Sequence, residues 1–159
     1  PFFDEKSNIL ILGSFPSVKS REENFYYANK QNRFWKVLAQ VFKDQVPESE
    51  SEKKDFLTAH GIALWDVIAS CEILGSSDAS IKDVKASDIS LILENAPIEK
   101  LVLNGKKAAQ LFYRNQGSAL PLRNCKAQVI EVYELPSTSP ANAAFSLDAL
   151  IAHCSIISK

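Results

Sequence analysis

Residues 9–13 read Ile-Leu-Ile-Leu-Gly, an uninterrupted apolar run that ends at a glycine. A run of this length without polar alternation is typical of a strand buried on both faces, as in a parallel sheet. Similar short runs recur at 62–65 and 101–103, and residues 128–133 (QVIEVY) are expected to form the fourth strand. Helical patterns separate the runs, so the chain consists of βα units. We therefore predict an α/β fold, a three-layer α/β/α sandwich around a central four-stranded parallel sheet.

The segments between these runs carry the helix signals. Residues 32–43 (NRFWKVLAQVFK) place their apolar side chains on one side of a helix. Further helices are expected from near Lys53 to Gly61, from 87–88 to just before Pro97, over 106–114 and from about Ser146. No repeat, low-complexity segment or linker divides the chain, so we predict one domain over residues 1–159.

The composition is that of an ordinary globular protein. The 159 residues are 46% hydrophobic and 23% charged, and one domain is what this length predicts. No apolar run is long enough for a membrane span, and no segment resembles a signal peptide. We expect a cytoplasmic, monomeric protein that does not associate with a membrane.

The charge pattern permits a nucleic-acid partner but does not demand one. The net charge of −1 lacks the basic excess that phosphate binding usually leaves. The basic residues are nevertheless clustered. Residues 101–130 contain five Lys or Arg and no Asp or Glu, and residues 15–43 contain six Lys or Arg and two Glu. Eleven acids and only four bases fall in 44–94. This segregation allows one basic face, although a solvated surface gives the same pattern.

The cysteines and histidines do not form a metal-binding pattern. Cys71, Cys125 and Cys154 are too far apart for a CxxC knuckle, and an odd number excludes a complete disulfide framework. The HxE and PCxxC signatures of zinc deaminases are also missing, which excludes that chemistry. We predict no metal and no cofactor.

Ligands of open α/β sheets bind beyond the carboxyl ends of the strands. Here those ends lead into 13–17 (GSFPS), 65–66 (WD), 104–105 (NG) and 135–140 (LPSTSP). None of them matches a phosphate-binding P-loop or a GxSxG nucleophile elbow. Taken singly, each is also compatible with an ordinary tight turn or helix cap.

The order of three segments is more informative than any one of them. Residues 13–17, then 26–38 (YYANKQNRFWKVL) and 135–143 (LPSTSPANA), closely resemble the DNA-deoxyinosine (hypoxanthine-DNA) glycosylases of the uracil-DNA glycosylase superfamily. They are more distantly similar to the mismatch-specific uracil/thymine-DNA glycosylases. The resemblance covers nearly all of 7–153. It implies a uracil-DNA glycosylase-like fold and a partner that is DNA containing a deaminated base, hypoxanthine first, then uracil or xanthine. Water would hydrolyse the N-glycosidic bond of the flipped base.

The resemblance also implies a pocket for the flipped base. The 13–17 loop would line this pocket and touch the flipped nucleotide through Gly13, Ser14 and Phe15. Tyr27 falls where the mismatch-type enzymes stack an aromatic ring on the base, although a tyrosine in the core is the alternative.

Two side chains at the end of the second strand are further candidates. Trp65 falls where other superfamily members place a base-reading side chain. Its neighbour Asp66 could accept a hydrogen bond from a purine N–H. Roles in core packing and capping remain open for both residues.

The loop after the fourth strand resembles the segment that these enzymes push into the minor groove of DNA. Ser137 stands at the position of a base-edge or sugar contact, and hydroxyl and backbone groups such as those of Ser139 can bind phosphates. Ala141 occupies the place where relatives often carry an apolar wedge such as Leu, so the flipped state would be held less tightly. The full set of predicted DNA contacts is Pro16, Ser17, Ser139, Pro140, Ala141 and Asn142.

The chain departs from the mismatch-type enzymes at the residue that positions the attacking water. Their first loop carries an Asn where this chain has Phe15, and no Asp or Glu lies in either signature loop. The resemblance to the deoxyinosine group implies that Asn32 takes the polar role. An amide cannot take up a proton at pH 7, but it can orient water. The alternative for Asn32 is a helix N-cap.

Two other functions remain open from the sequence. A nucleoside or nucleotide hydrolase could use the same kind of pocket on free substrates. The absence of an acidic residue from the signature loops also allows a damaged-DNA-binding module that has lost catalysis.

Overall fold

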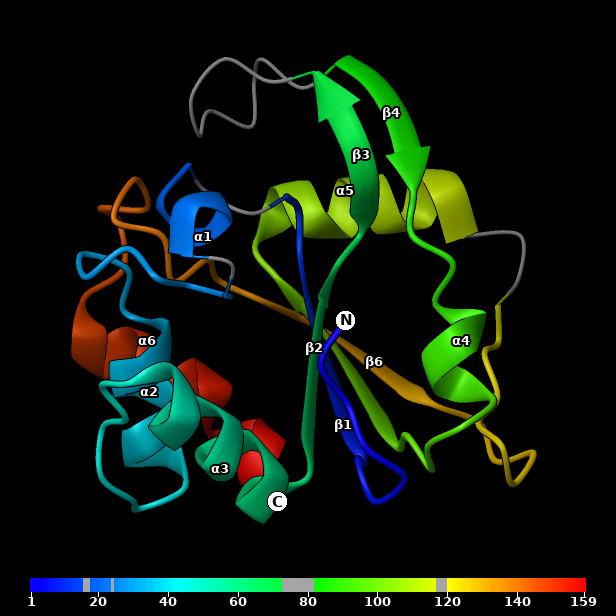
Figure 1. Cartoon of the computed structure of the whole chain (residues 1–159), viewed down its shortest axis with the longest axis horizontal. Coiled ribbons are helices and arrows are strands. Elements are labelled where there is room, and N and C mark those ends of the chain that lie inside the picture. Colours follow the sequence, from blue (N-terminus) through cyan, green and yellow to red (C-terminus); the bar gives the residue numbers. More distant parts are fainter. Residues whose placement is uncertain (16–17, 24, 73–81, 117–119) are drawn as a thin grey trace.

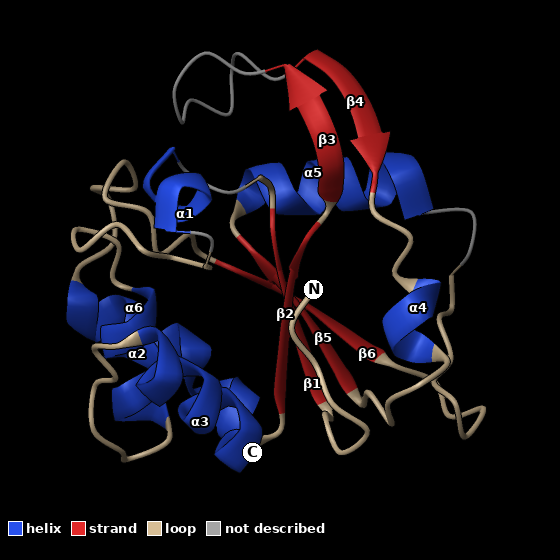
Figure 2. Ribbon diagram, in the orientation of Figure 1, coloured by secondary structure: helices blue, strands red, loops and turns tan. Residues whose placement is uncertain are grey.

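The computed structural model describes residues 1–15, 18–23, 25–72, 82–116 and 120–159. Its main sheet has four strands in the order β2-β1-β5-β6 (Figures 1 and 2). The strands are β1 (Ile9–Gly13), β2 (Ile62–Asp66), β5 (Lys100–Asn104) and β6 (Glu131–Leu135). All neighbouring pairs are parallel, so the four carboxyl ends lie at one edge. The predicted four-stranded parallel sheet is confirmed.

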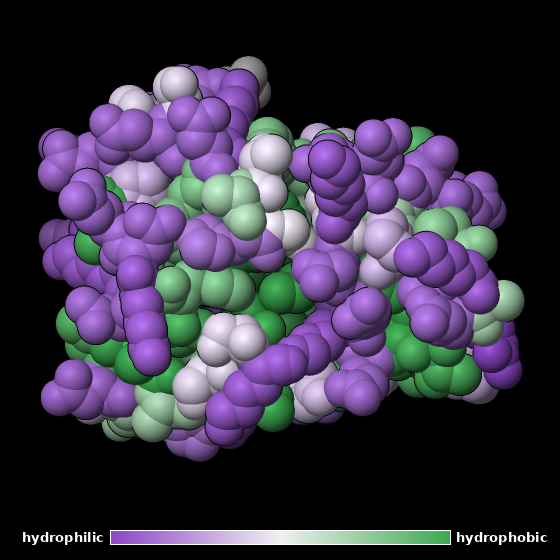
Figure 3. Space-filling view, turned by 90° about the horizontal axis from the view of Figure 1, so that it is seen from below, coloured by the Kyte–Doolittle hydropathy of each residue, from purple (hydrophilic) through white to green (hydrophobic). Residues whose placement is uncertain are grey.

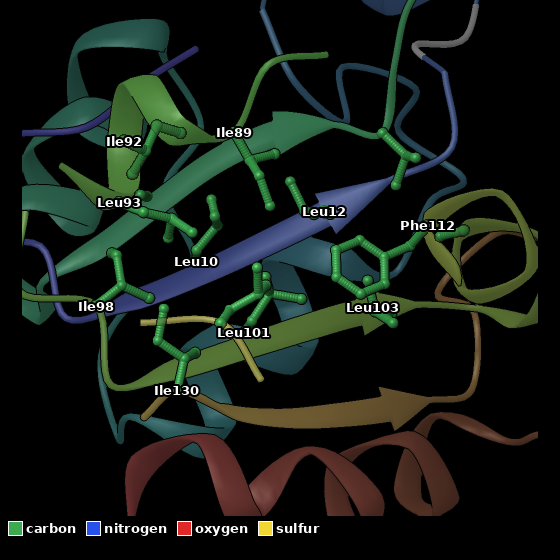
Figure 4. Packing of buried hydrophobic residues seen from close by; sticks show 14 of the residues in the cluster. Leu10, Leu12, Ile89, Ile92, Leu93, Ile98, Leu101, Leu103, Phe112 and Ile130 are labelled. Carbon is green, nitrogen blue, oxygen red and sulfur yellow. The ribbon is translucent and has the colours of Figure 1, made fainter. Parts of the chain in front are cut away.

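Helices cover both faces of this sheet (Figure 1). One face carries α2 (Phe34–Val41), α3 (Glu50–His60), α6 (Leu147–Cys154) and the 3₁₀-helix η3 (Ser155–Ser158), and the other carries α4 (Ser90–Leu93) and α5 (Lys106–Gln116). The alternation of β1 separates the two cores. Leu10 and Leu12 pack toward α4 and α5 (Figure 4), whereas Ile9 and Ile11 pack toward α2, α3 and α6. The three-layer sandwich is therefore confirmed.

Capping residues set the boundaries of two predicted helices. The Ser49 hydroxyl accepts a hydrogen bond from the Glu52 backbone N–H at 3.1 Å, so α3 begins three residues earlier than expected. Gly61 ends α3 with φ of 66°, a left-handed conformation that favours glycine. Ser146 caps α6 by accepting from the Ala149 N–H at 3.1 Å, which confirms the predicted start.

The fourth strand starts later than the predicted range 128–133. Val129 forms an isolated bridge with Arg123, and the Ile130 N–H donates to the Leu122 carbonyl at 2.9 Å. These residues thus pair back on the preceding loop before the chain joins β5. The strand begins only at Glu131, whose N–H reaches the Glu99 carbonyl.

Other elements differ from the sequence-based expectations. The helix expected from 87–88 to Pro97 shortens to the four residues of α4, and turns replace it over residues 94–95. The six-residue α1 (Val18–Glu23) was not predicted. Neither was the antiparallel hairpin of β3 (Ile68–Glu72) and β4 (Lys82–Ala86), which projects beyond the carboxyl edge of the sheet in Figure 2.

The opposite end of the molecule, where the strands begin, shows hydrophilic side chains interspersed with smaller apolar areas (Figure 3). Among the helices of the described ranges, none combines the length and the apolar character that a membrane crossing requires.

Candidate functional site

A pocket of about 280 Å³ opens at the carboxyl edge of the sheet. Its size is near the lower end of the range for small-molecule sites. Five parts of the chain supply its lining: the end of β1 and the segment that follows it, the segment before α2, the end of β2, the end of β5, and the loop after β6. The lining residues are Gly13, Ser14, Phe15, Ser20, Tyr26, Tyr27, Asn29, Asn32, Asp66, Asn104, Ser137, Thr138, Ser139, Pro140 and Ala141.

The floor of the pocket is polar and tightly built around Gly13. A Cβ atom at this position would lie 2.8 Å from Asp66 Oδ1 and 3.1 Å from the Tyr27 hydroxyl. A larger residue would collide with both groups, so glycine is required for this close approach. The carboxyl of Asp66 and the phenol of Tyr27 therefore meet at the end of the central strand β1.

Among the described residues that line the pocket, Asp66 has the one carboxyl group, and this residue is 8% exposed. Burial raises the pKa of this carboxyl to about 7. The Asp66 carboxyl is therefore protonated, and so neutral, in a large fraction of the molecules at physiological pH. A neutral carboxyl group both donates and accepts a hydrogen bond, whereas the ionised form only accepts.

Tyr27 has one ring face already covered by the protein. Its ring stacks on Phe34, with centroids 3.8 Å apart and planes 13° from parallel. The backbone of Tyr27 is left-handed, with φ of 52°, which is uncommon for a residue other than glycine. Burial raises the pKa of Tyr27, so the phenol keeps its proton at neutral pH.

Asn104 was not among the predicted site residues, although the Asn-Gly pair at 104–105 was noted at a strand end. Its Nδ2 donates to the Tyr27 hydroxyl and to the Thr138 hydroxyl, both at 3.1 Å. Its Oδ1 accepts from the Thr138 backbone N–H at 3.2 Å. Asn104 thus links Tyr27 to the loop after β6. The Asn-Gly pair at the strand end was the available sequence signal. The partners of the Asn104 amide, Tyr27 and Thr138, are distant in sequence and become apparent only in the folded structure.

Asn32 lines the pocket and also shapes the chain before α2. Its Oδ1 accepts from the Phe34 backbone N–H at 3.0 Å, which is an Asx turn that leads into the helix. The cap position itself is occupied by Arg33, which makes no side-chain cap. No group in the described ranges accepts a hydrogen bond from Asn32 Nδ2. The turn orients the amide, and its NH₂ group remains available to a ligand.

The β6–α6 loop (residues 136–145) uses its polar side chains to stabilise itself. The Ser137 hydroxyl accepts from the Ser139 N–H at 3.1 Å, and the Ser139 hydroxyl accepts from the Ala141 N–H at 3.2 Å. Asn142 Nδ2 donates to the Ser137 carbonyl at 3.0 Å. Ser137, Ser139, Pro140 and Ala141 line the pocket, whereas Asn142 supports the loop from outside the lining.

The remaining predicted residues are placed differently from one another. Ser14 and Phe15 line the pocket, and the Arg21 guanidinium lies 5.4 Å from the centroid of the Phe15 ring.

Trp65 is outside the lining and packs against the core on the α4 and α5 side. Adjacent strand residues point to opposite faces, so Trp65 turns away when Asp66 faces the pocket. Pro16 and Ser17 lie outside the described residues.

The arrangement suits a flat ligand with a polar edge. Aromatic rings form part of the wall, while the Asp66 carboxyl and the Asn32 amide offer hydrogen-bonding groups at fixed positions. Among the described residues, no group of three or more His, Cys, Asp or Glu side chains converges as metal ligands would.

Comparisons with known proteins agree on one family. A sequence model of the Uracil DNA glycosylase superfamily matches residues 1–153. A "Hypoxanthine DNA glycosylase" of Methanosarcina acetivorans is 36% identical over 145 residues, covering 90% of this chain and 85% of the relative. A protein of the same name from Methanosarcina barkeri is 35% identical over 112 residues, covering 69% of this chain and 71% of the relative.

A solved structure supports the same relationship. The solution NMR structure of a Methanosarcina acetivorans protein, described as a candidate uracil DNA glycosylase, superposes with a TM-score of 0.76 at 29% sequence identity. The match covers 99% of this chain and 94% of the other chain. The similarity therefore extends over the whole fold as well as the pocket segments.

Proposed function

The chain belongs to the uracil DNA glycosylase superfamily, and from this membership we propose that it excises hypoxanthine from DNA by hydrolysing the N-glycosidic bond. The relatives named hypoxanthine DNA glycosylase support this choice of base. Glycosylases act on a nucleotide that has been flipped out of the duplex, so they need a pocket deep enough for one base.

The observation that carries the proposal is the convergence of Asp66, Asn32 and the β6–α6 loop on one pocket. These groups meet the three needs of a glycosylase, which are to read a base edge, to act beside the sugar and to contact the DNA strand. They come from distant parts of the sequence, and a parallel sheet brings them together at its carboxyl edge.

Asp66 is proposed to read the edge of the base. Hypoxanthine, uracil and xanthine share a lactam edge, in which a carbonyl oxygen adjoins a ring N–H. A neutral carboxyl group can donate its O–H to that carbonyl and accept from that N–H at the same time. Phe15 and Tyr27 would border the ring system, and base–aromatic contacts of this kind are worth about 1–3 kcal/mol per base.

Asn32 is proposed to act beside the sugar. As the bond from C1′ to the base nitrogen breaks, the base leaves with the bonding electrons and C1′ becomes electron-poor. The oxygen of a water molecule then bonds to C1′ and releases a proton to solvent, which leaves an abasic site and, after protonation, a free base. The Asn32 amide can orient this water and stabilise the developing charge, because the Phe34 N–H already fixes its direction.

The β6–α6 loop is proposed to meet the DNA strand. Pro140 and Ala141 are exposed, and together with Ser139 they line the mouth of the pocket from this loop. Lys106 is exposed at the start of α5, directly after Gly105, where an added Cβ would lie 2.8 Å from Ser137 Cβ. A basic side chain beside the loop would attract a phosphate of the DNA backbone.

The proposed substrate preference can be tested with duplexes that carry one inosine, uracil or xanthine in the same sequence context. We expect inosine to give alkali-labile strand breaks fastest, because Phe15 stands where uracil-cutting relatives carry a small polar residue. Release of uracil at an equal or higher rate would contradict the preference but not the glycosylase activity. Cleavage of free deoxyinosine without cleavage of the duplex would point instead to a nucleoside hydrolase.

The role of the loop tip can be tested with Ala141→Leu. A leucine would fill more of the gap that a flipped nucleotide leaves in the stack, so we expect tighter binding to duplex with an abasic site. Fluorescence anisotropy on that duplex measures the effect, and undamaged duplex is the matched control. Equal or weaker binding to the abasic duplex would show that residue 141 does not enter the stack.

A further inference from the structure

Arg33 is half-buried at the start of α2 and directs its whole guanidinium group into the β6–α6 loop. Its Nη2 donates to the Ser139 and Asn142 carbonyls, each at 2.9 Å. Its Nη1 donates to the Phe145 carbonyl, and its Nε reaches the Thr138 carbonyl at 3.4 Å. The two segments lie side by side in Figure 1, although more than 100 residues separate them in the sequence.

The same residue is attached to the loop through its backbone. The Arg33 N–H donates to the Thr138 carbonyl at 3.1 Å. The residue before it is Asn32, whose side chain lines the pocket, whereas Arg33 itself is outside the lining. Arg33 therefore connects the segment that carries Asn32 with the loop that carries Ser137 to Ala141, and it does so from outside the pocket.

The contacts are specific to an arginine. The four acceptors are backbone carbonyls spread over residues 138–145, and a planar group with five N–H donors can reach all of them. A lysine would offer three donors from a single nitrogen. Within the described ranges no carboxylate lies at ion-pair distance from Arg33, and the partners of its guanidinium are all backbone carbonyls.

We propose that Arg33 is a positioning residue, which fixes the β6–α6 loop relative to the Asn32 amide and so preforms the base pocket. The proposal rests on the glycosylase function for its kinetic consequence but not for its structural one. A misplacement of about 1 Å can lower a rate about 100-fold even when the altered residue does not touch the substrate. The loop has no regular secondary structure of its own, so loss of these bonds should loosen it.

The test compares Arg33→Met, Arg33→Lys and Lys36→Met. Lys36 is exposed on α2 one turn further on, so Lys36→Met removes a charge from the same helix without touching the loop. Amide hydrogen exchange of a peptide covering residues 136–145 reports on the anchoring without any need for activity. The single-turnover rate on inosine-containing duplex, at saturating enzyme, reports on the positioning independently of binding strength.

We expect faster exchange in 136–145 and a rate at least 10-fold lower for Arg33→Met, partial recovery of both for Arg33→Lys, and wild-type behaviour for Lys36→Met. If Arg33→Met does not fold, Arg33→Lys against the wild type carries the same two measurements. Wild-type exchange in the altered protein would overturn the proposal. Faster exchange with an unchanged rate would also overturn it, because the contacts would then be merely structural. A wild-type protein that cuts no duplex would refute the glycosylase proposal instead, and the exchange measurement would still decide the anchoring.

Discussion

Asn32→Ala should lower the single-turnover rate of hypoxanthine release about 100-fold, which is the usual effect of removing one preorganised polar group from an active site. The substitution removes the amide that lines the pocket but leaves Tyr27, Asp66 and the β6–α6 loop in place. DNA binding should therefore change little. Quenched-flow or manual time courses with enzyme in excess, together with anisotropy on the same duplex, measure the two quantities.

The Asx turn of Asn32 requires a separate control, because its loss should lower stability by about 1 kcal/mol. Asn29 makes a similar turn at the pocket, where its Oδ1 accepts from the Gln31 N–H at 2.9 Å. Asn29→Ala should therefore show the stability loss with most of the rate retained. A folded Asn32→Ala protein that cuts at the wild-type rate would assign the catalytic role to another residue, with Asp66 the first to test.

Asp66→Asn should stabilise the fold, and the gain should grow with pH. Between a pKa of 3.8 in the unfolded chain and about 7 in the folded protein, the carboxyl is ionised when unfolded and protonated when folded, so folding takes up a proton. Wild-type stability therefore falls as the pH rises from about 4 to about 7 and then levels off. Once the carboxyl is ionised in both states, its burial destabilises the fold by about 4 kcal/mol.

An asparagine cannot ionise, so the substitution removes this penalty. Urea denaturation at pH 5 and at pH 8 measures it, and the gain should be larger at pH 8. Asp44 offers a contrast, because a hydrogen bond with His60 lowers the pKa of this exposed carboxyl. Asp44→Asn should show no gain that increases with pH. An Asp66→Asn gain that is equal at both pH values would mean that the carboxyl is already ionised near pH 5.

The amide that Asp66→Asn introduces would still offer one donor and one acceptor to a lactam edge. We therefore expect this variant to retain part of the base-release activity.

The fold was largely predictable because three of the four strands are continuous apolar runs, which are typical of strands buried on both faces. Ile9 to Leu12 shows no polar alternation, and its neighbours in the sheet show the same pattern. The fourth strand was misplaced because Val129 pairs back on Arg123, a local contact that hydrophobicity does not reveal. The β3–β4 hairpin was missed because its residues mix polar and apolar types without a clear period.

The candidate site was predictable as a set of loops but not as a set of side chains. Strand ends identified Gly13, Asp66 and the β6–α6 loop, since the carboxyl edge follows from the topology. Side-chain direction separated Trp65 from Asp66, and the sequence does not show which of two adjacent strand residues faces the pocket. Asn104 and Arg33 act across distances of 34 and more than 100 residues, so their partners could not be read from neighbouring sequence.

The contacts of Arg33 also bear on how freely the sequence of the β6–α6 loop can vary in this protein. Carbonyl oxygens are common to all amino acids, so an anchor that binds only carbonyls does not depend on which side chains the loop carries. Mutations at positions such as 140 and 141 could then alter which lesions or strand contexts are accepted without detaching the loop. Libraries randomised at these exposed positions, with Arg33 kept constant, would be a productive starting point for directed evolution of new base specificities.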